Sequence, residues 1–136
     1  MKLNTYLQFN GNCEAALSFY AEIFNGKVDL MRFRDAPPCE GMDAPPPDHI
    51  MHGCMTFADQ SLMGTDATMG AQAESMKGAH VVINTDDATQ AEEIFAALEL
   101  GGNVQMSLAK TFWAERYGIV TDRFGTAWMI NCAAAE

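Results

Sequence analysis

The residues of this chain best suited to chemistry are two histidines and a tyrosine. His52 and His80 fall in strands predicted over residues 50–57 and 78–85, and Tyr6 falls in the first predicted strand. An imidazole, with a reference pKa of about 6.5, can hydrogen-bond a ligand or act as a general acid or base. We therefore take His80, His52 and Tyr6 as candidates for catalysis, without assigning a catalytic residue.

The third histidine, His49, is interpreted as a loop residue that follows the prolines. His49 and His52 are three residues apart at the start of a strand, so they point to different faces unless a bulge intervenes. They are therefore unsuited to chelating one ion. Alternation places His52 on the same face as Cys54 and Thr56, where it can bind a ligand or lie at a dimer seam.

Aromatic residues are divided between core and binding site. Trp113 and Tyr117 are predicted in a loop between strands, beside Glu115 and Arg116, where a ring can form a pocket wall while its polar tip reaches a ligand. Asp122 is expected to accept backbone N–H bonds in the turn of a strand–turn–strand segment. The aromatic residues assigned to the core are Phe19, Phe24, Phe57 and Phe95.

The chain shows the same order of elements twice, which indicates an α+β protein of two tandem βαβββ modules in one domain, 1–136. Module 1 covers about 1–66, a linker 67–77, and module 2 about 78–136. Turn 10–12 is expected to cap the first helix through an asparagine. The predicted helices span 13–24 and 87–100, and the predicted strands span 3–9, 27–34, 50–57, 61–65, 78–85, 104–108, 116–121 and 126–131.

Period-2 alternation predicts which strand residues face away from the helices. The residues expected under the helices are Leu7, Phe9, Val81 and Ile83. The residues expected on the opposite faces are Tyr6, Gln8, His80, Val82 and Asn84.

Composition excludes several classes of function. The 136 residues are 49% hydrophobic and carry a net charge of -10, which argues against nucleic-acid and membrane partners. No apolar run reaches the roughly 18–20 residues of a membrane span, and no signal peptide is expected, because the first residues are polar. Reduced thiols in the cytoplasm are expected, because no Cys-x-x-Cys pair occurs among Cys13, Cys39, Cys54 and Cys132. Neither a Gly-x-Ser-x-Gly elbow nor a phosphate-binding glycine loop occurs.

Several segments resemble the PhnB-like subgroup of the vicinal oxygen chelate superfamily, which includes glyoxalases, fosfomycin-resistance proteins and extradiol dioxygenases. They are residues 6–20, 24–27, His52, 62–63, 112–113 and 117–131. The resemblance implies a curved mixed sheet around a central cavity that takes a small molecule. It also implies a homodimer. A label used for this subgroup names a methyltransferase, but no Gly-rich turn for a methyl donor follows a strand here.

The resemblance also bears on metal binding, because metal-dependent superfamily members supply four ligands, typically His and Glu. His80 matches one of these positions, whereas Tyr6, Met63 and Met129 fall at or near the others. A thioether is a poor ligand for hard or borderline divalent ions. We therefore predict no cofactor and no metal. A divalent metal belongs only to an alternative with the shifted ligand set His80, Gln8 and His52.

These observations predict a protein that binds or transforms a small molecule without the usual divalent metal. One alternative is a metal-dependent lyase, isomerase or dioxygenase of the glyoxalase kind, and another is a non-catalytic dimeric scaffold. The residues predicted to bind the ligand are Tyr6, Gln8, His52, His80, Trp113, Tyr117 and Met129.

Overall fold

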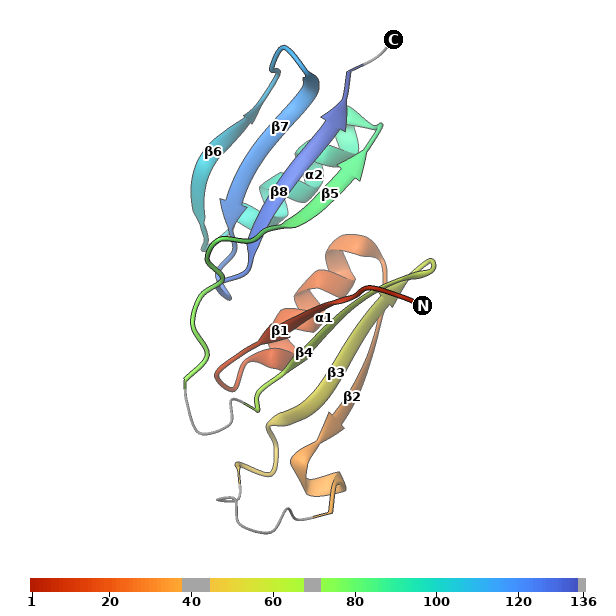
Figure 1. Cartoon of the computed structure of the whole chain (residues 1–136), viewed down its shortest axis with the longest axis vertical. Helices are drawn as coiled ribbons and strands as arrows, with labels where there is room; N and C mark the ends of the chain where they lie inside the picture. The colour runs from red at the N-terminus through yellow and green to blue at the C-terminus, as the bar shows by residue number, and fades with distance from the viewer. Residues whose placement is uncertain (38–44, 68–71, 135–136) are drawn as a thin grey trace. The chain divides into compact units, whose positions relative to one another are not determined.

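The computed structural model describes residues 1–37, 45–67 and 72–134. The chain forms two compact units, Met1–Glu74 and Ser75–Glu136, and each contains one βαβββ repeat (Figure 1). We call them module 1 and module 2 and describe each by itself. Among the described residues, no helix is long and apolar enough to cross a membrane.

Module 1 consists of a helix and a four-stranded mixed sheet. The sheet has the order β1-β4-β3-β2, in which β1 runs parallel to β4 and the other neighbours are antiparallel. Its elements are β1 (Thr5–Gln8), α1 (Cys13–Phe24), β2 (Lys27–Arg32), the short 3-10 helix η1 (Phe33–Asp35), β3 (Ile50–Phe57) and β4 (Gln60–Thr65).

Module 2 repeats this arrangement with the sheet order β5-β8-β7-β6. Its elements are β5 (Val81–Thr85), α2 (Ala88–Glu99), β6 (Asn103–Ala109), β7 (Ala114–Thr121) and β8 (Ala127–Ala133). The predicted α+β class with two tandem βαβββ modules is confirmed. The described strands form one four-stranded mixed sheet in each module. The central cavity stays a prediction.

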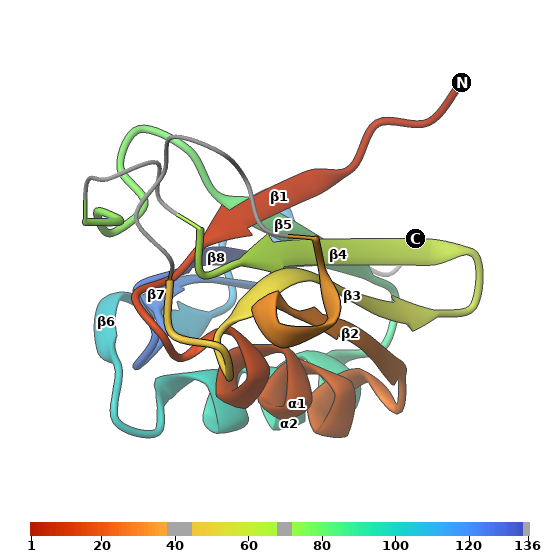
Figure 2. The same cartoon turned by 90° about the horizontal axis from the view of Figure 1, so that it is seen from below.

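Each helix covers one face of its own sheet, as Figure 2 shows for α1. Each helix comes close to its sheet because the strand residue beneath it is a glycine. A Cβ on Gly53 of β3 would lie 2.6 Å from Cδ1 of Leu17, and a Cβ on Gly118 of β7 would lie 2.8 Å from Cε2 of Phe95. These distances are shorter than atomic contact allows, so both positions require glycine or a shift of the helix side chain.

Alternation in the first strand of each module is confirmed. Leu7 and Phe9 are buried, whereas Tyr6 is 49% exposed and Val82 is 47% exposed. The start of β5 differs from the prediction: it begins at Val81 rather than at residue 78, so His80 precedes the strand. Helix α1 has the predicted bounds.

The N-terminus of α1 is capped by Asp66 rather than by an asparagine of the preceding turn. Asn12 occupies the N-cap position but makes no side-chain cap hydrogen bond. Instead, one oxygen of Asp66, Oδ1, accepts the N–H groups of Gly11 at 2.9 Å and Cys13 at 3.0 Å, and Oδ2 accepts that of Ile50 at 2.8 Å. One carboxylate therefore joins the start of α1, the start of β3 and the end of β4.

The turn between β7 and β8 is organised by Asp122, as predicted. Its Oδ1 accepts the backbone N–H groups of Phe124 at 2.8 Å and Thr126 at 3.1 Å. Its Oδ2 accepts the indole N–H of Trp128 at 2.8 Å. Because Asp122 is 3% exposed, these bonds replace the water it has lost.

Replacing Asp66 by asparagine should destabilise the protein by about 2–4 kcal/mol, because an amide offers one acceptor oxygen to three donors and leaves at least one buried N–H unsatisfied. Urea unfolding of Asp66→Asn measures this loss. The matched control is Asp59→Asn in the exposed turn before β4, which should change the free energy of unfolding by less than about 0.5 kcal/mol. Equal effects of the two changes would contradict the capping role.

Candidate functional site

The sheet of module 1 has one face without a helix. Gly53 and Gly64 point toward α1, since Cβ atoms built on them meet Leu17 and Cys13 of the helix. Residues one position away on each strand therefore point to the other side. We call this the helix-free face of module 1. Its members are Tyr6 and Gln8 on β1, Asp29 and Met31 on β2, His52 and Cys54 on β3, and Met63 on β4.

Two of the predicted site residues meet on this face. The phenol oxygen of Tyr6 lies 3.0 Å from Nδ1 of His52, and the rings are stacked with centroids 5.6 Å apart and an interplanar angle of 28°. The residues come from β1 and β3, which are separated by β4 in the sheet. The Tyr6 side chain therefore crosses β4 to reach the imidazole.

Burial raises the pKa of Tyr6 above its ordinary value of 10.0, with a smaller increase from Cys13 and an opposing effect of the Thr65 hydroxyl. The phenol is therefore protonated at neutral pH. Its hydrogen bond with Nδ1 fixes the tautomer of His52: if the phenol donates, Nε2 carries the imidazole proton, and if Nδ1 donates, Nε2 is a base. Either arrangement makes Nε2 the atom that can exchange a proton with a ligand.

The other histidine and glutamine predictions in module 1 have different outcomes. His49 lies in the bend before β3 with its ring against Gly11, which confirms it as a loop residue. The register between β2 and β3 shifts at the start of β3, so a bulge does separate His49 from His52. Gln8 is exposed at the end of β1, on the same face as Tyr6.

Module 2 groups three of the predicted ligand-binding residues. The hydroxyl of Tyr117 donates to the sulfur of Met129 at 3.2 Å, and the Tyr117 ring meets the Trp113 ring edge-on at 5.3 Å. Trp113 is 48% exposed, and the centroid of its ring lies 4.7 Å from that of the Phe112 ring. Trp113 lies in the loop, as predicted, whereas Tyr117 lies within β7, in keeping with the strand predicted over 116–121, although β7 begins two residues earlier, at Ala114.

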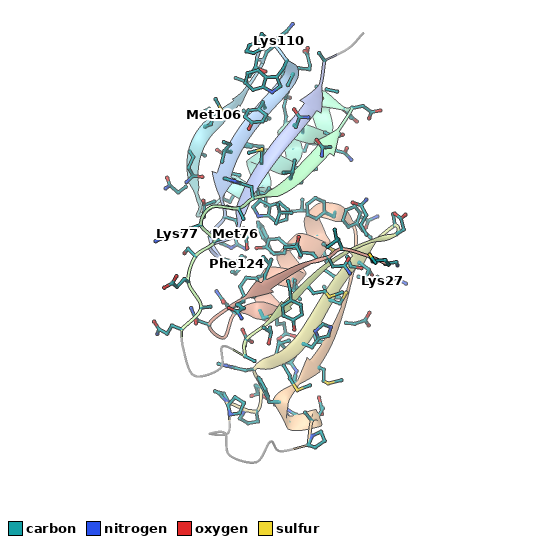
Figure 3. The ribbon with its side chains drawn as sticks, in the orientation of Figure 1. Lys27, Met76, Lys77, Met106, Lys110 and Phe124 are labelled. Atoms are coloured by element: carbon teal, nitrogen blue, oxygen red, sulfur yellow. The ribbon has the colours of Figure 1, made fainter. Side chains whose placement is uncertain are left out.

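Arg116, also predicted in that loop, holds β7 against α2. Its Nε donates to Glu92 at 3.0 Å, and it also bonds Glu115 of its own strand. Lys110, labelled at the β6–β7 hairpin in Figure 3, lies 3.7 Å from Glu115. These ion pairs are exposed and contribute little stability individually. The position of Arg116 is therefore explained by its contacts with Glu92 and Glu115 rather than by a ligand.

His80 is exposed and precedes β5. The two modules can be aligned through the glycines beneath their helices, Gly53 and Gly118. The register then makes His52 equivalent to Tyr117, Met63 to Met129, and Tyr6 to Val82. His80 consequently corresponds to Asn4, two residues before the position of Tyr6.

The described residues contain no group of three His, Cys, Asp or Glu side chains placed to hold a metal ion. The thioethers of Met63 and Met129 occupy central positions on their sheets, paired with Tyr6 and Val82. Sulfur of this kind is a weak ligand for hard cations. The geometry thus offers an imidazole, a phenol and an amide for chemistry, rather than a carboxylate-rich centre.

Three cysteines of the described chain are free thiols, and Cys39 lies outside the described residues. Cys13 and Cys132 are buried, whereas Cys54 is half-buried on the helix-free face. Burial, with the nearby carboxylates of Asp66 and Glu14, raises the pKa of Cys13 to about 12. Cys13 is therefore an inert core thiol, and Cys54 is the cysteine placed among candidate site residues.

Comparison with known proteins connects this geometry to a family. The family described as 3-demethylubiquinone-9 3-methyltransferase matches residues 1–131. Protein YjdN of Escherichia coli strain K12 is 31% identical over 140 residues, which cover 96% of this chain and 95% of that protein. Protein PA1353 from Pseudomonas aeruginosa has a crystal structure with 39% identity, a TM-score of 0.87 and coverage of 98% of both chains.

A more distant structure shares the fold alone. The crystal structure of a glyoxalase/bleomycin resistance protein from Albidiferax ferrireducens T118 is 12% identical, with a TM-score of 0.66 and coverage of 98% of this chain and 99% of that chain. The tandem βαβββ arrangement is therefore shared with glyoxalase-like proteins.

The raised pKa of Cys13 predicts a loss of stability at alkaline pH. The thiol ionises near 9.0 when unfolded but near 12 when folded, so the stabilisation is complete below pH 9 and is lost as pH rises toward 12. Urea unfolding between pH 8 and 11 should show a smaller alkaline loss for Cys13→Ala than for the parent protein. The control variant Cys54→Ala should lose as much stability at alkaline pH as the parent protein. Parallel curves for all three proteins would refute the assignment.

Proposed function

The chain belongs to the 3-demethylubiquinone-9 3-methyltransferase family, the PhnB-like branch of the vicinal oxygen chelate superfamily, and from this premise we propose that it binds or transforms a small molecule without the superfamily's usual divalent metal. We also propose a cytoplasmic location, because the four cysteines include no Cys-x-x-Cys pair and fit reduced thiols.

The observation that carries this proposal is the contact between Tyr6 and His52. A phenol and an imidazole 3.0 Å apart, on a sheet face without a helix, form a polar pair that the packing of module 1 does not require. Both side chains are accessible, since Tyr6 is 49% exposed and His52 is half-buried. Such a pair is suited to orient a ligand and to move one of its protons.

In this function His52 is the acid or base and Tyr6 is the group that orients it. A ligand oxygen within hydrogen-bond distance of Nε2 gives up a proton to it when Nδ1 donates to Tyr6, and it accepts a hydrogen bond from Nε2–H when the phenol donates to Nδ1. We assign Gln8, on the same face, to hydrogen bonding with the ligand. In module 2 we assign His80, Trp113, Tyr117 and Met129 to ligand binding, with the two aromatic rings as a wall.

Methyl transfer, which the family description names, is not the proposed activity. A methyl donor of the usual kind is held by a Gly-rich turn between a strand and a helix. The turn from β1 to α1 contains Gly11, but its N–H is bonded to the carboxylate of Asp66. In module 2 the corresponding turn contains Asp86 and Asp87, and Asp87 caps α2 through Thr89 and Gln90. Both turns are thus committed to capping.

We propose a homodimer as the functional unit. The sheets end in the edge strands β1 and β2 in module 1 and β5 and β6 in module 2, and exposed edges favour pairing between subunits. Sedimentation equilibrium at tens of micromolar should give the mass of two chains, twice 14.8 kDa. A monomer under these conditions would exclude the dimer without affecting the proposed ligand site.

The ligand site can be tested by thermal shift against a metabolite library, with and without a chelator. A ligand that stabilises the parent protein should bind at least about 10-fold more weakly to His52→Ala and Tyr6→Phe, since each loses a hydrogen bond worth about 1.5 kcal/mol. A ligand held by module 2 should be weakened instead by His80→Ala and Trp113→Ala. All four variants should remain folded.

Phe95→Ala is the control for a structural effect. Its ring is buried under α2 against Gly118, and its removal should cost about 3–5 kcal/mol. If His52→Ala and Tyr6→Phe lost as much stability as Phe95→Ala, or if every ligand required a divalent ion removable by the chelator, the metal-free proposal would fail.

A further inference from the structure

The helix-free face of module 1 is rich in sulfur around His52, and the proposed function does not use this feature. Cys54 pairs directly with Met63 between β3 and β4. Met31 pairs directly with His52 between β2 and β3. One imidazole, one thiol and two thioethers therefore occupy adjacent positions on three neighbouring strands.

The spacing allows these side chains to converge above the sheet. Directly opposed residues have Cβ atoms about 4.5–5.5 Å apart, and residues two apart on a strand are separated by roughly 6.8 Å. His52 and Cys54 have this second spacing, with Gly53 between them turned toward Leu17. The flexible side chain of Met63 can reach into the space between the imidazole and the thiol.

The hydrogen bond of His52 also suits a metal ligand. Tyr6 engages Nδ1, which leaves Nε2 as the nitrogen directed to a bound ion. Metal-binding histidines commonly bond their second ring nitrogen to an outer group that fixes the ring. Asp29 pairs with Cys54 across β2 and β3, so a negative charge lies beside the thiol. The chain as a whole carries a charge of -10, which favours a cation.

The donor types decide which ion fits. Thiolate and imidazole bind both Cu(I) and Zn²⁺, whereas thioether sulfur binds soft ions such as Cu(I) and is a poor ligand for Mg²⁺, Mn²⁺ and Zn²⁺. The described residues offer no third His, Cys, Asp or Glu ligand to complete a zinc site with His52 and Cys54, so the two thioethers favour Cu(I). We propose that the helix-free face of module 1 binds one soft monovalent metal ion, Cu(I), through His52 Nε2, Cys54 Sγ and Met63 Sδ, with Met31 as an additional thioether. This site needs no organic ligand, but it uses the same nitrogen, Nε2 of His52, so a bound ion and the small molecule of the proposed function exclude each other there.

The test is an anaerobic titration of the intact protein with Cu(I) in competition with a chromogenic Cu(I) chelator. The parent protein should take up one equivalent per chain. Cys54→Ser and Met63→Leu should each weaken binding by on the order of 100-fold, and Tyr6→Phe by about 10-fold as an outer group. Met63→Leu preserves side-chain volume, so it should remain folded, as circular dichroism can verify.

Two control variants distinguish this site from other sulfur-containing residues of the chain. Met106→Leu changes an exposed methionine on β6 of module 2 (Figure 3), and Cys39→Ser removes the thiol outside the described residues. Both should bind Cu(I) like the parent protein. Loss of binding in Cys39→Ser but not in Cys54→Ser would overturn the proposal, as would failure of the parent protein to compete with the chelator.

The same variants separate this inference from the proposed function. A small molecule found by thermal shift should still bind Met63→Leu in the absence of copper but should bind His52→Ala weakly. If Cu(I) fails to bind while the small molecule binds as proposed, only the copper site is wrong. If Cu(I) binds through Cys54 and Met63 and no small molecule stabilises the protein, only the proposed function is wrong.

Discussion

The close approach of a helix to a strand glycine determines how each module presents its side chains. At Gly53 and Gly118 a Cβ would lie 2.6 Å and 2.8 Å from a side chain of the covering helix. The glycine fixes which alternate residues of the strand face the helix, so the residue before it must face away. That residue is His52 in module 1 and Tyr117 in module 2. Core packing thus decides the placement of two candidate site residues.

The same alignment reveals that the modules have diverged in chemistry while keeping one fold. His52 is bonded to Tyr6 on the first strand, whereas its equivalent Tyr117 is bonded to Met129 on the last strand. Val82 occupies the place of Tyr6. The hydrogen-bonded tyrosine–histidine pair therefore belongs to module 1, and the corresponding positions of module 2 are mainly apolar. Duplication of the fold has not duplicated its polar pair.

Sequence patterns predicted what depends on local periodicity. The bounds of α1 and β3 and the turn at Asp122 follow from residues close together in the chain. The cap of α1 does not, because Asp66 is 53 residues from Cys13, and Asn12 is the better local cap by residue type. The Tyr6–His52 contact joins residues 46 apart in the chain, across an intervening strand. Alternation within one strand gives the face of a residue but not its partner on another strand, so it could not predict this contact. His80 lies two residues before the position equivalent to Tyr6, because β5 begins at Val81 rather than at residue 78.

The equivalent methionines Met63 and Met129 show how one residue type can serve different chemistry in two copies of a fold. In module 2 the sulfur of Met129 accepts a hydrogen bond from Tyr117, which engages one of its lone pairs. In module 1 the register places Met63 opposite Cys54, a second soft donor. A carboxylate at both positions would favour a hard cation, and a thioether disfavours one in both. The neighbours of the two thioethers therefore differ, a phenol in module 2 and a thiol in module 1, so the chemistry of each sheet has to be argued separately.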